Sequence, residues 1–171
     1  VAVDDLIVEA DPHPCTITHT VISSAVGYDT YIVPDITGSI IENDLPGLQI
    51  VGEPDLISET GPTSDTFQVR LLSQPTANVV VSFTSTDGQT TVTSSLTFTS
   101  VNWNTYQNVT VTAVDDPIAE ASPHVGNIGI TTSSSDSLYN GLTDTASANI
   151  TDNDSAAATV NESGGTTVVV E

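Results

Sequence analysis

Residues 66–83 read Thr-Phe-Gln-Val-Arg-Leu-Leu-Ser-Gln-Pro-Thr-Ala-Asn-Val-Val-Val-Ser-Phe. Apolar residues occupy every second position on both sides of the Gln-Pro pair, at Phe67, Val69, Leu71, Val79, Val81 and Phe83. Such alternation places apolar side chains on one face of a β-strand and polar side chains on the other. The stretch therefore predicts two half-buried strands, separated by a turn at Gln74–Pro75.

The same pattern continues outward along the chain. Further alternating pairs are Leu96 with Phe98, Val109 with Val111, and Ile128 with Ile130. Turn signals separate them at Gly61–Pro62, Asp87–Gly88 and Asn140–Gly141. No segment has the apolar spacing of a helix. We predict an all-β chain whose main unit is an immunoglobulin-like β-sandwich of about seven short strands.

The composition limits the classes of partner. Hydrophobic residues make up 37% of the chain, and Val, Ile, Thr and Ser dominate, which favours a folded β protein over a disordered one. There are 22 acidic residues against one basic residue, Arg70, for a net charge of −21. This balance excludes nucleic acid and anionic membrane surfaces as partners and favours metal cations. Adaptation to salty water is a second explanation of the acidity. No apolar run is long enough to insert into a membrane.

An internal repeat organises the sequence. Residues 3–13 read Val-Asp-Asp-Leu-Ile-Val-Glu-Ala-Asp-Pro-His, and residues 114–124 read Val-Asp-Asp-Pro-Ile-Ala-Glu-Ala-Ser-Pro-His, so eight of eleven positions agree. Residues 40–44 correspond in the same way to residues 150–154, 110 positions later. The agreement predicts tandem β-sandwich units with a period of about 110 residues.

The repeat also predicts the domain boundaries. Residues 45–154 form one complete sandwich, and residues 1–44 form the C-terminal part of a preceding unit. Residues 155–171 form the opening strands of a following unit, or a strand donated to a neighbouring copy. Donation between copies does not supply the middle strands of the missing parts, so we favour a longer array or filament.

Acidic residues gather where the predicted strands end. They are Asp115, Asp116 and Glu120, then Asp152 and Asp154 with the neutral Asn153 between them, together with Asp87 in a turn and Glu59 before the strand at Phe67. In a sandwich these segments can meet at one end, where the carboxylates would repel one another unless a cation lay between them. Calcium binds six to eight oxygen ligands, so we predict a calcium site.

The run Asp115-Asp116-Pro117-Ile118-Ala119-Glu120 resembles the calcium-binding loop of Calx-β domains, which has the pattern Asp-Asp-x-Ile-x-Glu. The resemblance implies side-chain ligands at both aspartates and at the glutamate, and a carbonyl ligand at Ile118. It also implies ligands at Asp87, at Glu59 and in the triplet 152–154. Pro123 stands where the family often has a further acidic residue, and Asn153 is a weaker ligand than aspartate.

The resemblance extends to the partial units. The corresponding residues are Asp4, Asp5, Ile7, Glu9, Asn43, Asp44 and Glu162. The chain is also similar to the tandem Calx-β-like repeats of large secreted bacterial surface proteins, in which such modules act as spacers, adhesin stalks or fibre units. This similarity implies an extracellular or cell-surface location.

Several other residues invite a functional interpretation. Pro-His recurs at His13 and His124, but a zinc site is not expected because no Cys or His stands at ligand spacing. Cys15 is interpreted as a small buried hydrophobe, with an intermolecular disulfide as the alternative. Trp103 either caps the sandwich or stacks on a sugar. Four residues match the N-glycosylation pattern: Asn108, Asn149, Asn153 and Asn161.

Catalysis is not predicted, because the carboxylates recur at unit ends without a convergent base or nucleophile. We expect a structural repeat of an extracellular filament or stalk, stiffened by calcium at the junctions. Its partners would be neighbouring repeats or copies of the same protein, with glycans as a further partner. The alternative is an adhesin module that binds carbohydrate or another cell surface, with an exposed aromatic platform near Trp103 or Tyr106.

Overall fold

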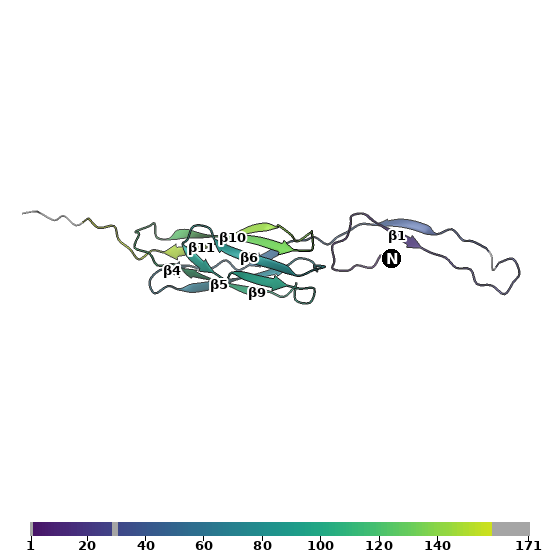
Figure 1. The fold of residues 1–171 in the computed structure, drawn as a ribbon, viewed down its shortest axis with the longest axis horizontal. Coiled ribbons are helices and arrows are strands. Elements are labelled where there is room, and N and C mark those ends of the chain that lie inside the picture. The colour runs from purple at the N-terminus through teal and green to yellow at the C-terminus, as the bar shows by residue number, and fades with distance from the viewer. Residues whose placement is uncertain (1, 29–30, 159–171) are drawn as a thin grey trace, which may run out of the picture.

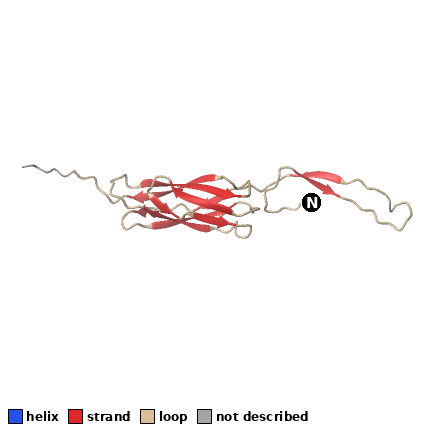
Figure 2. Cartoon of the chain, viewed as in Figure 1, coloured by secondary structure: helices blue, strands red, loops and turns tan. Residues whose placement is uncertain are grey.

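The computed structural model describes residues 2–28 and 31–158. Within them the chain is all-β, as predicted, and Figure 2 shows strands joined by loops and turns. The strands are β1 His13–Ile17, β2 Ile36–Ile40, β3 Leu48–Val51, β4 Ile57–Ser58, β5 Ser64–Leu71, β6 Val79–Ser85, β7 Thr90–Val92, β8 Ser95–Phe98, β9 Gln107–Ala113, β10 His124–Ser134 and β11 Thr143–Thr151. Among the described residues no helix is long and apolar enough to cross a membrane.

Nine of these strands form two sheets. One sheet has the order β4-β11-β10-β6-β8, and the other has the order β3-β5-β9-β7. Neighbouring strands are antiparallel except β11 and β4, which are parallel. The two sheets lie one above the other in Figure 1. Their strands run from Leu48 to Thr151, inside the predicted unit 45–154.

The core lies between the two sheets and follows the predicted alternation. Phe67 on β5 and Phe83 on β6 meet edge to face, with ring centroids 5.9 Å apart. The alternating residues singled out in the sequence are buried, apart from Leu96, which is half-buried against the core. Burial of one apolar face of each sheet supplies the main driving force for this fold.

The turns also lie where glycine predicts them. Gly88 and Gly141 have φ angles of +84° and +80°, a region that glycine adopts without the steric penalty of a Cβ atom. Both residues connect strands of the sandwich. The Asp87–Gly88 and Asn140–Gly141 pairs are therefore the chain reversals expected from the sequence.

The remaining two strands, β1 and β2, form a separate antiparallel hairpin in which His13 is paired with Ile40. Figure 1 shows the hairpin beyond one end of the sandwich, while residues 155–158 leave the other end. The hairpin corresponds to β10 and β11 of the sandwich, where His124 is paired with Ile150. The repeat seen in the sequence thus has the same strand pairing in both copies.

Candidate metal centre

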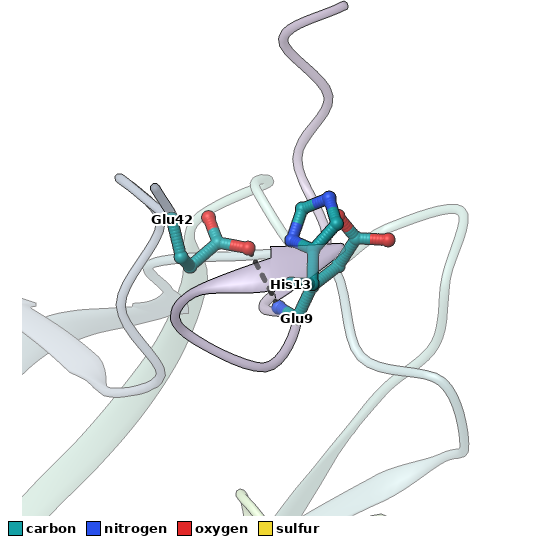
Figure 3. A group of neighbouring side chains, drawn as sticks. All are labelled: Glu9, His13 and Glu42. Carbon is teal, nitrogen blue, oxygen red and sulfur yellow. Dashed lines mark hydrogen bonds and ion pairs between the residues drawn. The ribbon is translucent and has the colours of Figure 1, made fainter. Parts of the chain in front are cut away.

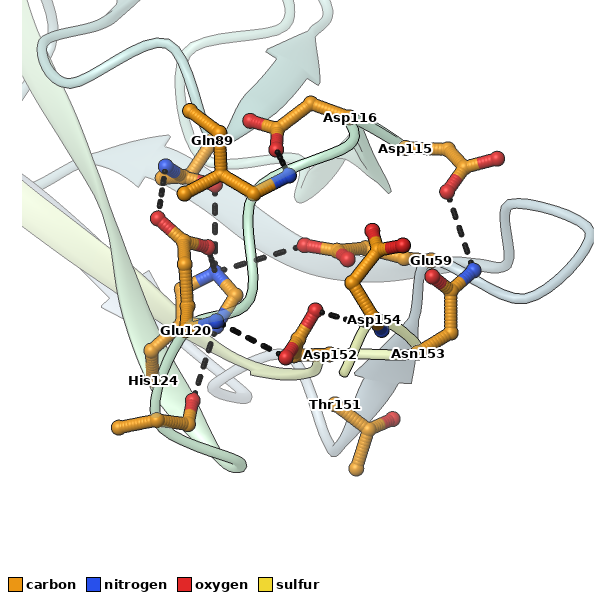
Figure 4. A network of polar contacts seen from close by, with 12 residues as sticks. Glu59, Gln89, Asp115, Asp116, Glu120, His124, Thr151, Asp152, Asn153 and Asp154 are labelled. Carbon is orange, nitrogen blue, oxygen red and sulfur yellow. Dashed lines mark hydrogen bonds and ion pairs between the residues drawn. The ribbon is translucent and has the colours of Figure 1, made fainter. Parts of the chain in front are cut away.

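Three segments that are distant in the sequence meet at the end of the sandwich away from the hairpin (Figure 1). The parallel pairing of β11 with β4 aligns Thr151 with Ser58, and the N–H of Glu59 donates to the carbonyl oxygen of Thr151 at 3.2 Å. The pairing of β10 with β11 begins at His124, opposite Ile150. The loop between β9 and β10 closes over these strand ends, as Figure 4 shows.

Glu59 is the most unusual residue of this group. Its side chain is fully buried, and neither carboxylate oxygen receives a hydrogen bond of normal geometry. Oxygens of Glu59, Asp152 and Asp154 lie within 4.8 Å of one another. Burial, and next the negative charge of Asp152, raise the pKa of Glu59, and the neighbouring His124 only partly offsets them. The sandwich therefore buries a carboxyl group whose charged form its surroundings disfavour.

Asp152 has the opposite character. Its two oxygens accept the backbone N–H groups of Asp154 at 3.0 Å and Glu120 at 2.9 Å. These two hydrogen bonds lower the pKa of Asp152, because they stabilise the charged carboxylate. Asp152 thereby ties the β9–β10 loop to the end of β11 and stays ionised beside Glu59.

A second group combines Glu59 and Glu120 with His124, and again the three ligand atoms lie within 4.8 Å of one another. His124 was not among the predicted site residues, because no Cys or His stands at ligand spacing from it and Glu59 is 65 positions away. The recurrence of Pro-His in the repeat was the available signal. Gln89, whose amide donates to Glu120 at 2.9 Å, carried no such signal.

The two aspartates of the β9–β10 loop lie at the rim of the site. Asp115 accepts a hydrogen bond from the side-chain amide of Asn153 at 3.0 Å, and Asp116 accepts the N–H of Ile118 at 2.8 Å. An open depression is lined by Asp115, Asp116, Pro117, Asn153 and Asp154. The loop thus presents carboxylates next to the buried group, and their role as ligands stays a prediction.

Asp87 is held by Asn127 on the neighbouring strand β10 and by the N–H of Gln89 in its own turn. Its carboxylate accepts the N–H of Asn127 at 2.6 Å, the side-chain amide of Asn127 at 2.8 Å and the N–H of Gln89 at 3.2 Å. Burial opposes ionisation of Asp87, but these hydrogen bonds outweigh it and lower its pKa. The structure does not group Asp87 with the carboxylates of Glu59, Asp152 and Asp154.

The hairpin copy reproduces the rim contacts. The side-chain amide of Asn43 donates to Asp4 at 3.1 Å, as in the equivalent pair at the sandwich end. The N–H of Ile7 donates to Asp5 at 2.9 Å, again as in the sandwich. The two loops therefore fold alike, which is the structural counterpart of their matching sequences.

The inner contacts recur as well (Figure 3). The N–H of Glu9 donates to Glu42 at 2.7 Å, and His13 Nε2 lies 3.2 Å from a Glu9 oxygen. Hydrogen bonds from the N–H groups of Asp44 and Glu9 lower the pKa of Glu42, whereas burial and the charge of Glu42 raise that of Asp44. Glu42 and His13 were not predicted as site residues, although the repeat aligns Glu42 with Asp152.

The predicted glycosylation sites and the predicted ligand Glu162 remain to be placed. Asn108, Asn149 and Asn153 are exposed, which leaves their glycosylation a prediction. Glu162 and Asn161 lie outside the described residues.

The aromatic residues considered for sugar binding are not exposed platforms. Trp103 packs in the core at 8% exposure, as a cap on the sandwich. Tyr106 is half-buried, and the guanidinium of Arg70 lies 4.8 Å from its ring centroid. Cys15 is half-buried on β1 and has a free thiol.

No family model matches the chain, and no curated protein matches it at a significant level.

Proposed function

We propose that this chain is a structural unit of an extracellular filament or stalk, in which calcium bound at the ends of immunoglobulin-like, Calx-β-like sandwiches stiffens the junctions between tandem repeats. The observation that carries the proposal is the buried carboxyl group of Glu59, which lies beside Asp152 and Asp154 and has no hydrogen-bond donor of normal geometry. An uncompensated buried anion is costly, and a bound cation removes that cost. Oxygen ligands of this number and type suit calcium.

The recurrence of the loop supports a role at junctions. The hairpin carries a second acidic loop, and this copy contacts the neighbouring sandwich: the carbonyl oxygen of Leu6 accepts the N–H of Gln74 at 2.6 Å. Calcium in such a loop would order the segment that faces the next unit. Ordering it restricts the freedom of the linker and stiffens the array.

A structural role is favoured over catalysis and over adhesion. The carboxylates recur in both copies in the same hydrogen-bonded arrangement, which suits a repeated joint better than an active site. The adhesin alternative required an exposed aromatic platform near Trp103 or Tyr106, and both side chains are engaged within the sandwich. Neighbouring repeats or copies of the protein are therefore the proposed partners, outside the cell, where calcium is abundant.

The proposal is tested by thermal unfolding of the 171-residue chain after exhaustive chelation, with and without millimolar calcium at constant ionic strength. We expect calcium to raise the unfolding midpoint, because an ion that binds only the folded state stabilises it by mass action. The double variant Asp115→Ala, Asp116→Ala should lose most of the rise, whereas Asp144→Ala, an exposed aspartate on β11, should keep it. An unchanged midpoint in the native chain would remove the calcium assignment and leave the acidity as a salt adaptation.

A further inference from the structure

The His124 group differs chemically from the all-oxygen group. We propose that Glu59, Glu120 and His124 form a second metal site, which takes a borderline transition-metal ion such as Zn²⁺. This inference stands without the calcium proposal, although the two sites share Glu59. It also differs from the sequence analysis, which expected no zinc site because no Cys or His partner stands at ligand spacing.

The distances fit a small four-coordinate ion. His124 Nε2 lies 3.2 Å from Glu120 Oε2 and 3.7 Å from Glu59 Oε1. Zinc bonds nitrogen and oxygen ligands at about 2.0–2.2 Å in a tetrahedron, so its ligands stand about 3.3 Å apart. Only small side-chain movements separate the present geometry from that arrangement.

The imidazole is oriented as in metal sites. Its Nδ1 lies 3.2 Å from the carbonyl oxygen of Ala121, to which a protonated Nδ1 would donate, and Nε2 faces the carboxylates (Figure 4). Metal-binding histidines usually make this outer hydrogen bond, which sets the tautomer and the ring orientation. Gln89 donates to the other oxygen of Glu120 at 2.9 Å, and its own carbonyl oxygen lies 3.2 Å from Nε2.

Burial and unpartnered oxygens also favour a cation here. The side chains of Glu59 and His124 are 1% and 12% exposed, and that of Glu120 is 23% exposed. Both oxygens of Glu59 and Oε2 of Glu120 receive no hydrogen bond of normal geometry. An ion bound by these three residues would coordinate one oxygen of Glu59 and one of Glu120.

The ligand set selects the kind of ion. Calcium and magnesium are bound through oxygen, and an imidazole nitrogen in the first shell disfavours both. Zinc and related ions accept imidazole nitrogen together with carboxylate oxygen. The competing explanation is that a protonated His124 itself neutralises the glutamates, in which case no metal binds Nε2.

The hairpin provides an internal comparison. Glu9, His13 and Glu42 also bring three ligand atoms within 4.8 Å, and His13 Nε2 lies 3.2 Å from Glu9. Glu42 already accepts N–H groups through both oxygens, and Glu9 is exposed. The hairpin group should therefore bind Zn²⁺ more weakly than the His124 group.

The decisive experiment titrates Zn²⁺ into the metal-free 171-residue chain by calorimetry. His124→Gln should weaken the tightest binding event by more than the roughly 10–100-fold that loss of an outer-shell partner costs, and Gln89→Ala should weaken it within that range. His19→Ala is the matched control, since His19 is exposed on the β1–β2 connection, and it should change nothing. Calcium titration of the same variants separates the two sites, because His124→Gln should leave calcium binding intact.

A spectroscopic readout keeps the test valid even if His124→Gln folds poorly. In the native chain labelled with ¹⁵N-histidine, one equivalent of Zn²⁺ should shift the Nε2 resonance of His124 and leave that of His19 unchanged. Co²⁺ in place of Zn²⁺ should give the strong visible absorption of a four-coordinate site. An Nε2 resonance that does not respond to Zn²⁺, or tight binding that survives in a folded His124→Gln variant, would overturn the proposal.

Discussion

Replacement of Glu59 by glutamine should have opposite effects on stability with and without calcium. Glutamine has nearly the shape of glutamate but no charge, so it relieves the repulsion with Asp152 and Asp154 in the metal-free chain. It also provides an amide donor next to their oxygens. In the presence of calcium the same change removes a charged ligand from the proposed site. The variant should therefore be more stable than the native chain in chelator and less stable in calcium.

The structure sets the size of both effects. A fully buried polar group without a hydrogen-bond partner costs about 1–3 kcal/mol, and Glu59 is such a group in the absence of metal. Its replacement should recover stability of that order. Calcium at about 100 times its dissociation constant would stabilise the native chain by about 2.7 kcal/mol, most of which the variant should forgo. In a chain of this size about 1 kcal/mol moves the unfolding midpoint by roughly 2–4 °C.

The assay is urea or thermal unfolding of the native chain and of Glu59→Gln, each in chelator and in millimolar calcium. Glu53→Gln is the matched control, because Glu53 is exposed and undergoes the same chemical change. A variant that is less stable than the native chain in chelator would refute the reasoning, since it would mean that His124 already compensates Glu59. An undiminished calcium response would show that calcium does not use Glu59.

Two further predictions concern the opposite end of the sandwich. Asp136 is buried, and the hydrogen bonds that it accepts from Thr76 and from the N–H of Leu138 outweigh burial and lower its pKa. Asp136→Asn should therefore lower the free energy of unfolding by about 1–3 kcal/mol at pH 7. That contribution is present above about pH 4, the range of an unfolded aspartate, and is lost as the pH falls through the lowered native pKa, so urea unfolding at pH 3 should show a smaller difference. Tyr139→Phe should lower the free energy of unfolding by about 1–3 kcal/mol in the same assay. The buried hydroxyl donates to the carbonyl oxygen of Ser73 at 2.7 Å and accepts the N–H of Ser73 at 3.1 Å, and phenylalanine loses both hydrogen bonds. An unchanged free energy of unfolding would contradict this prediction.

Local patterns in the sequence were sufficient for the strands and for the repeat. Alternation at Phe67, Val69 and Leu71 predicted a strand with one buried face, and the structure buries all three. Side-chain alternation follows from the geometry of a single strand, so it needs no knowledge of the partner strand. The repeated Asp-Asp-x-Ile-x-Glu run likewise predicted two loops of the same form, and both copies make the same aspartate contacts.

The composition of the candidate site depended on pairings that no local pattern encodes. The parallel contact between β11 and β4 brings Glu59 beside Asp152, although 93 positions separate them. Burial of Glu59 follows from this packing, as does its approach to His124. Trp103 illustrates the same limit, because its place in the core rather than on the surface depends on which sheet face covers it.

The sequence by itself therefore determined the all-β class, the turns, the strong acidity, and the recurrence of an acidic loop. These properties depend on residue type and short spacing. Only the tertiary structure decided that Glu59 is a buried carboxyl group without a hydrogen-bond donor, that His124 faces it, and that Asn127 on β10 donates to Asp87. Those facts arise from long-range strand pairing, which sets the burial and the hydrogen bonds of each carboxylate and thereby its capacity to bind a metal ion.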